Sequence, residues 1–199
     1  MKWFIITTVF FSILFISNSI YSYIFRSVSE VNLNQKNEVY SDSFYDLSAL
    51  SIDGKDISFK SFKGKKVLIV NVASECGYTD QYDDLQYLHR KYSNRLVILG
   101  FPSNNFGKQE PGSNQDIKNF CEAKFGITFP MTEKVSVKGN NAHPFYVWAK
   151  ENHGKSAIPK WNFHKIIIDK KGKIYTTFSS ITSPSSKKFI KIIEELINT

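Results

Sequence analysis

Cysteine is scarce in this chain of 199 residues, which contains only Cys76 and Cys121. Two cysteines are too few for a disulfide-stabilised scaffold. The four histidines lie at least ten residues apart and none stands at ligand spacing from a cysteine, which argues against a zinc site. The two thiols are therefore a reactive pair, a structural disulfide or two unrelated core residues.

The sequence also lacks the marks of several large ligand-binding classes. It has no internal repeat, no phosphate-binding Walker loop and no glycine fingerprint for dinucleotides. The formal net charge is +8, but the lysines are spread along the chain and never form a run of five basic residues. We interpret this charge as a solvated surface and expect no nucleic-acid partner.

The first 25 residues have the composition of a targeting segment. Lys2 precedes an apolar run from Trp3 to Ile16, which predicts a signal peptide or signal anchor over residues 1–25. Residues 26–43 are polar and rich in Asn and Ser, which predicts a spacer or transit segment. We expect entry into the secretory pathway. A leader of this kind resembles those of proteins sent on to an apicoplast-like plastid, with the mitochondrion or the cytosol as alternatives. Contact with a membrane is expected only through an uncleaved leader.

Residues 44–199 are patterned as one globular domain. Apolar runs and turn residues predict strands in four places: a hairpin around Asp53-Gly54, buried strands at 65–73 and 95–101, and a hairpin through Lys171-Gly172. Helical periodicity predicts four helices: from Thr79, over 113–126, over 141–154, and from Ser183-Pro184 onward. This order predicts an α/β, thioredoxin-like fold, in which helices flank a mixed central sheet and a β-hairpin precedes it.

Cys76 falls between a buried strand and an amphipathic helix. The positive end of a helix favours a thiolate over a thiol, although a cysteine that simply packs in the core is an equal alternative. A dithiol oxidoreductase needs C-x-x-C, but the third residue after Cys76 is Thr79. A cysteine hydrolase needs a histidine base, and no local signature links one to Cys76. A thiol peroxidase needs only an activated thiolate and hydrogen-bond donors around it.

Five segments in order resemble the glutathione peroxidase family, and in particular its cysteine-type, thioredoxin-dependent branch. The similarity extends from about Phe44 to Ile197, and the segments are “NVASECGYT” (71–79), “LGFPSNNFGKQEPGSN” (99–114), “FCEAKFGITFP” (120–130), “KGNNAHPFY” (138–146) and “WNFHKIIIDKKGKI” (161–174). The resemblance implies a peroxidase in which Cys76 is the peroxidatic residue and Gln109, Trp161 and Asn162 complete the catalytic set. Their amide and indole N–H groups are neutral donors that favour a charged sulfur.

By pattern alone, Cys121 is a residue on the apolar face of the helix over 113–126. The resemblance implies that it is the resolving thiol, which condenses with the Cys76 sulfenic acid to a transient Cys76–Cys121 disulfide. A disulfide requires Cα atoms within about 7 Å, so we predict local unwinding of this helix on oxidation. Many relatives have a cysteine where this chain has Ser103, which leaves Cys121 as the one intramolecular candidate; Asn105 replaces a frequent glutamine.

The resemblance further implies hydrogen peroxide and organic hydroperoxides as substrates, an antioxidant role and no bound cofactor. Thioredoxin is the expected reductant, and the segment between Gly126 and Trp161 is short, as in relatives without the loop used for tetramer contacts and glutathione recognition. We therefore expect a monomer or a weak dimer. Three alternatives stay open: a glutathione-dependent peroxidase, a peroxide sensor that passes its disulfide to a partner, and a non-catalytic binding module.

Overall fold

The structure is a computed structural model that describes residues 43–198. The expected leader (1–25) and all but the last residue of the expected spacer (26–43) lie outside the described residues. Among the described residues, no helix has both the length and the apolar character needed to cross a membrane.

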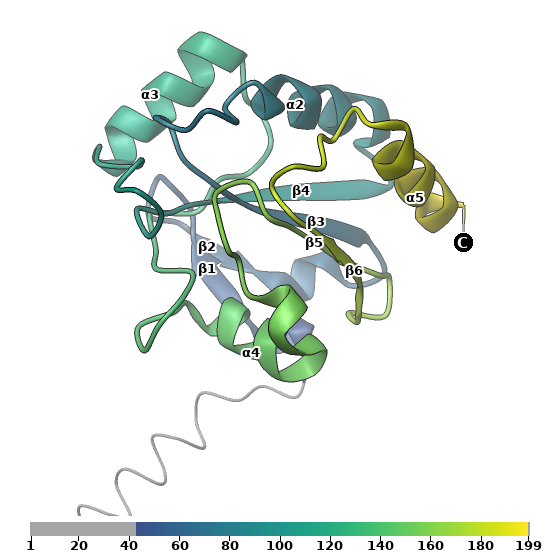
Figure 1. Cartoon of the computed structure of the whole chain (residues 1–199). Coiled ribbons are helices and arrows are strands. Elements are labelled where there is room, and N and C mark those ends of the chain that lie inside the picture. The colour runs from purple at the N-terminus through teal and green to yellow at the C-terminus, as the bar shows by residue number, and fades with distance from the viewer. Residues whose placement is uncertain (1–42, 199) are drawn as a thin grey trace, which may run out of the picture. The chain divides into compact units, whose positions relative to one another are not determined.

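The elements follow the predicted order (Figure 1). In chain order the strands and helices are β1 (Ser48–Leu50), β2 (Asp56–Ser58), β3 (Lys66–Val72), α2 (Gln81–Tyr92), β4 (Leu96–Pro102), α3 (Asn114–Phe125), α4 (Pro144–His153), β5 (Lys165–Ile168), β6 (Ile174–Phe178) and α5 (Lys187–Ile197). Short 3-10 turns, η1 (Phe44–Asp46), η2 (Phe59–Phe62) and η3 (Gly154–Ala157), complete the chain.

The central sheet has the strand order β4-β3-β5-β6. β3 and β4 are parallel, whereas β5 pairs antiparallel with both β3 and β6. The predicted first hairpin forms a separate two-stranded sheet, in which Ala49 pairs with Ile57. The mixed sheet predicted from the sequence is therefore confirmed.

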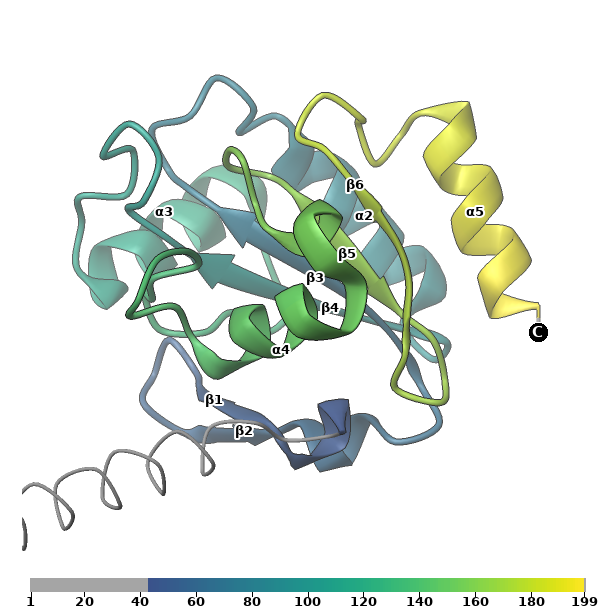
Figure 2. The same cartoon turned by 60° about the horizontal axis from the view of Figure 1, so that its bottom comes forward.

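Alternating side chains of β3 build a core on each face of the sheet. Leu68 and Val70 join a cluster with apolar residues of α2, α3 and α5, whereas Val67 and Ile69 join one with residues of α4 and the N-terminal turns. In both views of the molecule, α2 and α5 lie on one side of the central sheet, and α4 and the β1–β2 hairpin lie on the other (Figures 1 and 2). Burial on both faces explains why β3 reads as a continuous apolar run.

Three predicted helix starts are displaced. α2 begins at Gln81 after Asp80, not after Thr79, because residues 74–80 form consecutive turns. In α4 the Nδ1 atom of His143 accepts a hydrogen bond from the Phe145 amide, so the helix starts after His143 rather than near Asn141. α5 starts after Ser186, whose hydroxyl accepts from the Phe189 amide, and not at Ser183-Pro184. A side chain that caps the free amides thus sets the start of α4 and of α5.

Candidate active site

Cys76 lies in the turn segment that joins β3 to α2. Its side chain is 5% exposed, and its carbonyl accepts a hydrogen bond of 3.2 Å from the Thr79 amide. The first helical residue, Gln81, comes five positions later. Because the field of a helix end decays within its first turn, the helix supports a thiolate at Cys76 less than the sequence suggested. Further donors to the sulfur are therefore sought in other segments that contact this loop.

Gln109 is held beside the Cys76 loop by its backbone. Its carbonyl accepts a hydrogen bond of 3.0 Å from the amide of Glu75, the residue before Cys76. Gly107 and Lys108 both have positive φ, +61° and +54°, which turns the chain back before Gln109. A non-glycine residue in this conformation stores strain, a feature that is common at functional sites.

Asn162 orients the Gln109 side chain. Asn162 is fully buried, and its Nδ2 donates a 2.9 Å hydrogen bond to Gln109 Oε1. Since the amide oxygen of Gln109 is occupied in this way, its two Nε2–H groups remain as donors. The two amides therefore form one unit, with the Gln109 N–H groups as the outer face.

Asn71, a fully buried residue of β3, fixes the turn that carries Trp161 and Asn162. Its Nδ2 donates to the Trp161 carbonyl at 3.1 Å, and its Oδ1 accepts from the His164 amide at 3.2 Å. Its own carbonyl accepts from the amide of Phe163, a residue with a φ of +61°. The polar side chain inside the apolar strand thus locks a strained turn in place.

Trp161 is the most exposed of the residues in this hydrogen-bonded turn. Its side chain is 40% exposed, and its ring lies 5.9 Å from that of Phe106. A Cβ atom built on Gly107 would lie 3.5 Å from both the Trp161 ring and the Gln109 side chain, so the two side chains flank the same glycine. The structure therefore brings Gln109, Trp161 and Asn162 together and ties the residue before Cys76 to Gln109.

Cys121 lies in the buried face of α3, and both cysteines are free thiols. They belong to the same core cluster. Burial raises the pKa of Cys121 to about 11, and the neighbouring Tyr82 hydroxyl, which favours the thiolate, offsets part of this rise. A thiol with this pKa is protonated at neutral pH, so Cys121 is a poor nucleophile while α3 is folded.

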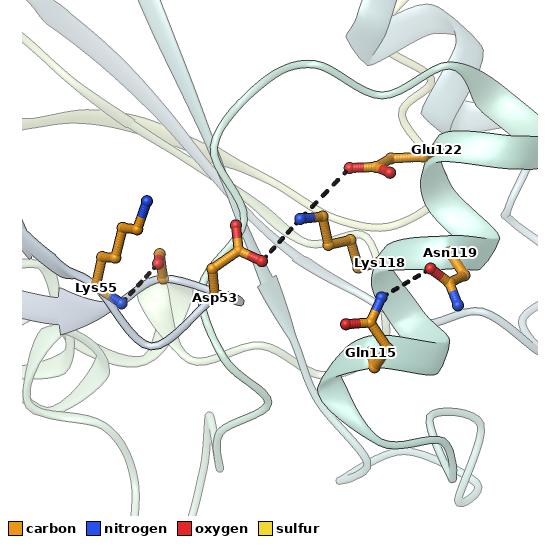
Figure 3. A network of polar contacts seen from close by, with 7 residues as sticks. Asp53, Lys55, Gln115, Lys118, Asn119 and Glu122 are labelled. Carbon is orange, nitrogen blue, oxygen red and sulfur yellow. Dashed lines mark hydrogen bonds and ion pairs between the residues drawn. The ribbon is translucent and has the colours of Figure 1, made fainter.

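A cavity of about 480 Å³ lies between α3 and the turn that joins β1 to β2, and Cys121 is one of its lining residues. Across it, Lys118 donates a 2.8 Å hydrogen bond to Asp53 and lies 4.0 Å from Glu122 (Figure 3). Gln115 donates to Asn119 on the same helix surface. The Asp53–Lys118 ion pair therefore fastens the helix that carries Cys121 to the N-terminal hairpin.

Ser103 and Asn105 have structural roles. The Asn105 Oδ1 accepts hydrogen bonds from the Val137 amide at 2.6 Å and from the hydroxyls of Ser103 and Ser136 at 3.1 Å. This side chain joins the loop after β4 to residues 136–137. Asn105 therefore positions the segment that leads to Gln109.

Sequence reasoning missed Asn71, Tyr82 and Glu110. Asn71 could have been found as the one polar residue inside the apolar run of β3. Tyr82 has the spacing of an apolar residue on the buried face of α2, which gives no hint of a role for its hydroxyl group. Burial raises its pKa well above the usual value, and the nearby Cys121, Glu110 and Cys76 raise it further. Glu110 gave no signal beyond its place next to Gln109.

The described residues hold no cluster of three His, Cys, Asp or Glu side chains that could bind a metal ion. The fold is thioredoxin-like, and the loop after β3 carries one cysteine in place of a dithiol motif and is hydrogen-bonded to the backbone of Gln109. Fold and site together indicate a thiol peroxidase and not a dithiol oxidoreductase.

Comparison with known proteins identifies the family. Residues 44–150 match the family model described as glutathione peroxidase. Glutathione peroxidase-like peroxiredoxin 2 of Saccharomyces cerevisiae is 49% identical over 149 residues, which cover 72% of this chain and 91% of that protein. The hydroperoxy fatty acid reductase gpx1 of Synechocystis sp. is 44% identical, covering 72% and 90%. The crystal structure of Trgpx in apo form has a TM-score of 0.63 and 34% identity, covering 80% and 98%. The chain belongs to the glutathione peroxidase family and is a peroxidase.

Proposed function

We propose that Cys76 reduces hydrogen peroxide and organic hydroperoxides, and that its disulfide with Cys121 is recycled by thioredoxin. The observation that carries the proposal is the pair formed by the buried Asn162 and the partly exposed Gln109, which are joined by a 2.9 Å hydrogen bond and tied through the Glu75 amide to the Cys76 loop. Neutral amides that point their N–H groups at a sulfur stabilise its thiolate without competing as nucleophiles.

In the first step the Cys76 thiolate attacks one peroxide oxygen. The S–O bond forms as the O–O bond breaks, Cys76 becomes a sulfenic acid, and the departing alkoxide or hydroxide takes up a proton. Negative charge moves from the sulfur to the leaving oxygen in this step. The Nε2–H groups of Gln109 and the indole N–H of Trp161 are suited to stabilise that charge, since they are uncharged donors on two side chains that both contact the space beside Gly107.

In the second step Cys121 condenses with the Cys76 sulfenic acid. Cys121 is buried in a helix with closed ends: Ser113 and Asp116 form a capping box, and Gly126 ends the helix with a φ of +57°. The thiol therefore reaches Cys76 only if part of α3 unwinds. The disulfide that results is a substrate for a dithiol protein such as thioredoxin.

Substitution of Cys121 by serine tests the second step. We expect Cys121→Ser to consume one equivalent of peroxide at the wild-type rate and to lose turnover with thioredoxin, because its sulfenic acid has no partner thiol. Rapid-quench mass spectrometry and a coupled thioredoxin assay measure the two steps, and Cys76→Ser is the inactive control. Full thioredoxin turnover by Cys121→Ser contradicts the proposal, and rapid oxidation of the wild type with poor recycling identifies a sensor.

Two further assays measure which reductant and which peroxide the enzyme prefers. Thioredoxin and glutathione are compared at equal thiol concentration, and we expect thioredoxin to support the faster turnover because Cys121 supplies the disulfide that a dithiol reduces. A relative is named a hydroperoxy fatty acid reductase, which supports lipid hydroperoxides as substrates for this chain. Linoleate hydroperoxide and hydrogen peroxide are the two probes.

We also propose that residues 1–43 direct the enzyme into the secretory pathway and onward to a plastid, and that the folded domain is a monomer or a weak dimer. The apolar run after Lys2 and the polar stretch after residue 25 support the first part. A reporter fused to residues 1–45 measures the destination, and a cytosolic reporter contradicts this proposal. Sedimentation of the domain measures its assembly, and a stable tetramer contradicts the second part.

A further inference from the structure

A second cavity lies between the two cysteine-bearing segments. It has a volume of about 300 Å³ and is lined by Ser74 and Glu75 on the Cys76 side and by Ile117 and Phe120 of α3 on the Cys121 side. Glu110 and the residues after it close the cavity between these two walls. Glu110 lies close enough to Cys121 for its charge to raise the pKa of that thiol, so the cavity brings Glu110 near both cysteine-bearing segments.

Glu110 is an unusual lining residue. It is fully buried, and neither of its carboxyl oxygens has a hydrogen-bond partner among the described residues. The Ser74 hydroxyl is also buried without a hydrogen bond of normal geometry, yet it lies close enough to the Glu110 carboxyl group to lower the pKa of that group. A buried carboxyl group without partners is costly and calls for a specific role.

The backbone around Glu110 is fixed while its carboxyl group is left free. The Glu110 amide donates a 2.9 Å hydrogen bond to Asn104 Oδ1. The Lys134 ammonium donates to the carbonyls of Glu110, Pro111 and Gly112, which accounts for its three N–H groups. The nearest cation thus holds the chain and makes no hydrogen bond to the carboxylate.

We propose that the Glu110 carboxylate accepts the thiol proton of Cys121 as Cys121 attacks the Cys76 sulfenic acid. This inference rests on the proposed function. The Cys121 sulfur forms the S–S bond while the S–O bond of Cys76 breaks. Glu110 then gives the proton to the departing hydroxide, which leaves as water. Cys121 is oxidised and the sulfenic sulfur is reduced, so the step needs no outside oxidant or reductant.

The charges around Glu110 are consistent with a proton acceptor at neutral pH. Burial raises its pKa to about 7, against the lowering effects of Ser74 and Lys134, and the Glu75 carboxylate raises it further. From the two helices that face it, the titratable groups are Tyr82 of α2 and Cys121 and Asp116 of α3. General-base catalysis is most effective when the acceptor titrates near the working pH.

The test measures sulfenic acid formation and disulfide formation separately in single turnovers with one equivalent of hydrogen peroxide. In Glu110→Gln we expect the first rate to stay within about twofold of wild type and the second to fall by roughly 10²-fold, the usual size of a general-base effect. Glu151→Gln is the matched control, because Glu151 is an exposed carboxylate of α4 that does not line the cavity, and we expect wild-type rates.

The pH profile separates a proton acceptor from a structural residue. In the wild type we expect disulfide formation to accelerate as the pH rises through about 7, and in Glu110→Gln this inflection is absent; Glu110→Asp retains it. The proposal is overturned if Glu110→Gln forms the disulfide at the wild-type rate, or if it forms the disulfide more slowly but with the same pH inflection. A wild-type rate that does not change with pH also overturns it. Failure of the wild type to form any disulfide instead overturns the proposed function itself.

Discussion

At the scale of single residues, the site is built from uncharged donors held by buried polar side chains. Asn71 fixes the turn of Trp161 and Asn162, and Asn162 in turn orients Gln109. Each link is a hydrogen bond in a water-poor setting, where amide geometry is preserved because an unmade bond is costly. The proposed activation of Cys76 therefore rests on a chain of hydrogen bonds between neutral side chains.

The side-chain amide of Gln109 can be replaced by an apolar group of similar length, so its N–H donors can be tested with little change in side-chain shape. Gln109→Met keeps the length of the side chain but removes its N–H donors, and we expect the rate of Cys76 oxidation by peroxide to fall on the order of 10²-fold. Stopped-flow measurement of peroxide consumption gives this rate. Gln115→Met, on the exposed surface of α3, is the control with unchanged kinetics. A wild-type rate for Gln109→Met excludes Gln109 from the catalytic set.

At the scale of elements, α3 is the part of the fold whose stability bears on the proposed second step. The helix buries only Ile117, Cys121 and Phe125, and its ends are closed by the capping box and by Gly126. Outside these contacts it is fastened to the hairpin by the Asp53–Lys118 ion pair (Figure 3). An opening that frees Cys121 must break that pair.

Removal of the ion pair is expected to speed disulfide formation. Asp53→Asn keeps the shape of the turn but loses an exposed pair worth roughly 0.2–1 kcal/mol, so we expect an acceleration of about 1.5- to 5-fold at low salt. The difference is expected to vanish in high salt because ions screen the pair. Rapid-quench trapping of free thiols measures the rate.

The matched control for this prediction is Glu195→Gln, which removes the exposed Lys191–Glu195 pair of α5. This pair lies on a helix that carries no cysteine, so its loss is expected to leave the rate of disulfide formation unchanged. An equal acceleration in both variants indicates a general loss of stability. A slower rate in Asp53→Asn contradicts the fastening role of the pair.

Most elements could be predicted from the sequence because their signals are local. The capping box of Ser113 and Asp116 and the left-handed Gly126 marked both ends of α3 correctly. The starts of α2, α4 and α5 were misplaced because turns or caps such as His143 compete there with the expected residues. The carboxyl group of Glu110 could not be recognised, since its burial depends on segments far apart in the chain.

At the scale of the whole molecule, several buried ionisable groups set the dependence of stability on pH. Burial lowers the pKa of His143 and His164 to about 4 and that of Lys165 to about 7, whereas it raises that of Glu110 to about 7. Between pH 6.5 and about 4 the unfolded chain holds more protons on the two histidines, so acid destabilises the fold. Glu110 opposes this trend between about 7 and 4.5, because there the folded state holds its proton.

Two histidines outweigh one carboxyl group, so we expect the free energy of unfolding to fall as the pH is lowered from 6.5 to 4. His143→Asn isolates one contribution, because asparagine is a strong N-cap that can still accept from the Phe145 amide but does not titrate. Since His143 is only partly covered, we expect the variant to recover on the order of 2 kcal/mol of this acid loss. Urea unfolding at pH 7.5, 6, 5 and 4, with wild type and variant side by side, measures the slope. If the free energy of unfolding of His143→Asn falls as steeply with decreasing pH as that of the wild type, His143 is charged in the folded protein. Burial of this histidine then does not cause the loss of stability in acid.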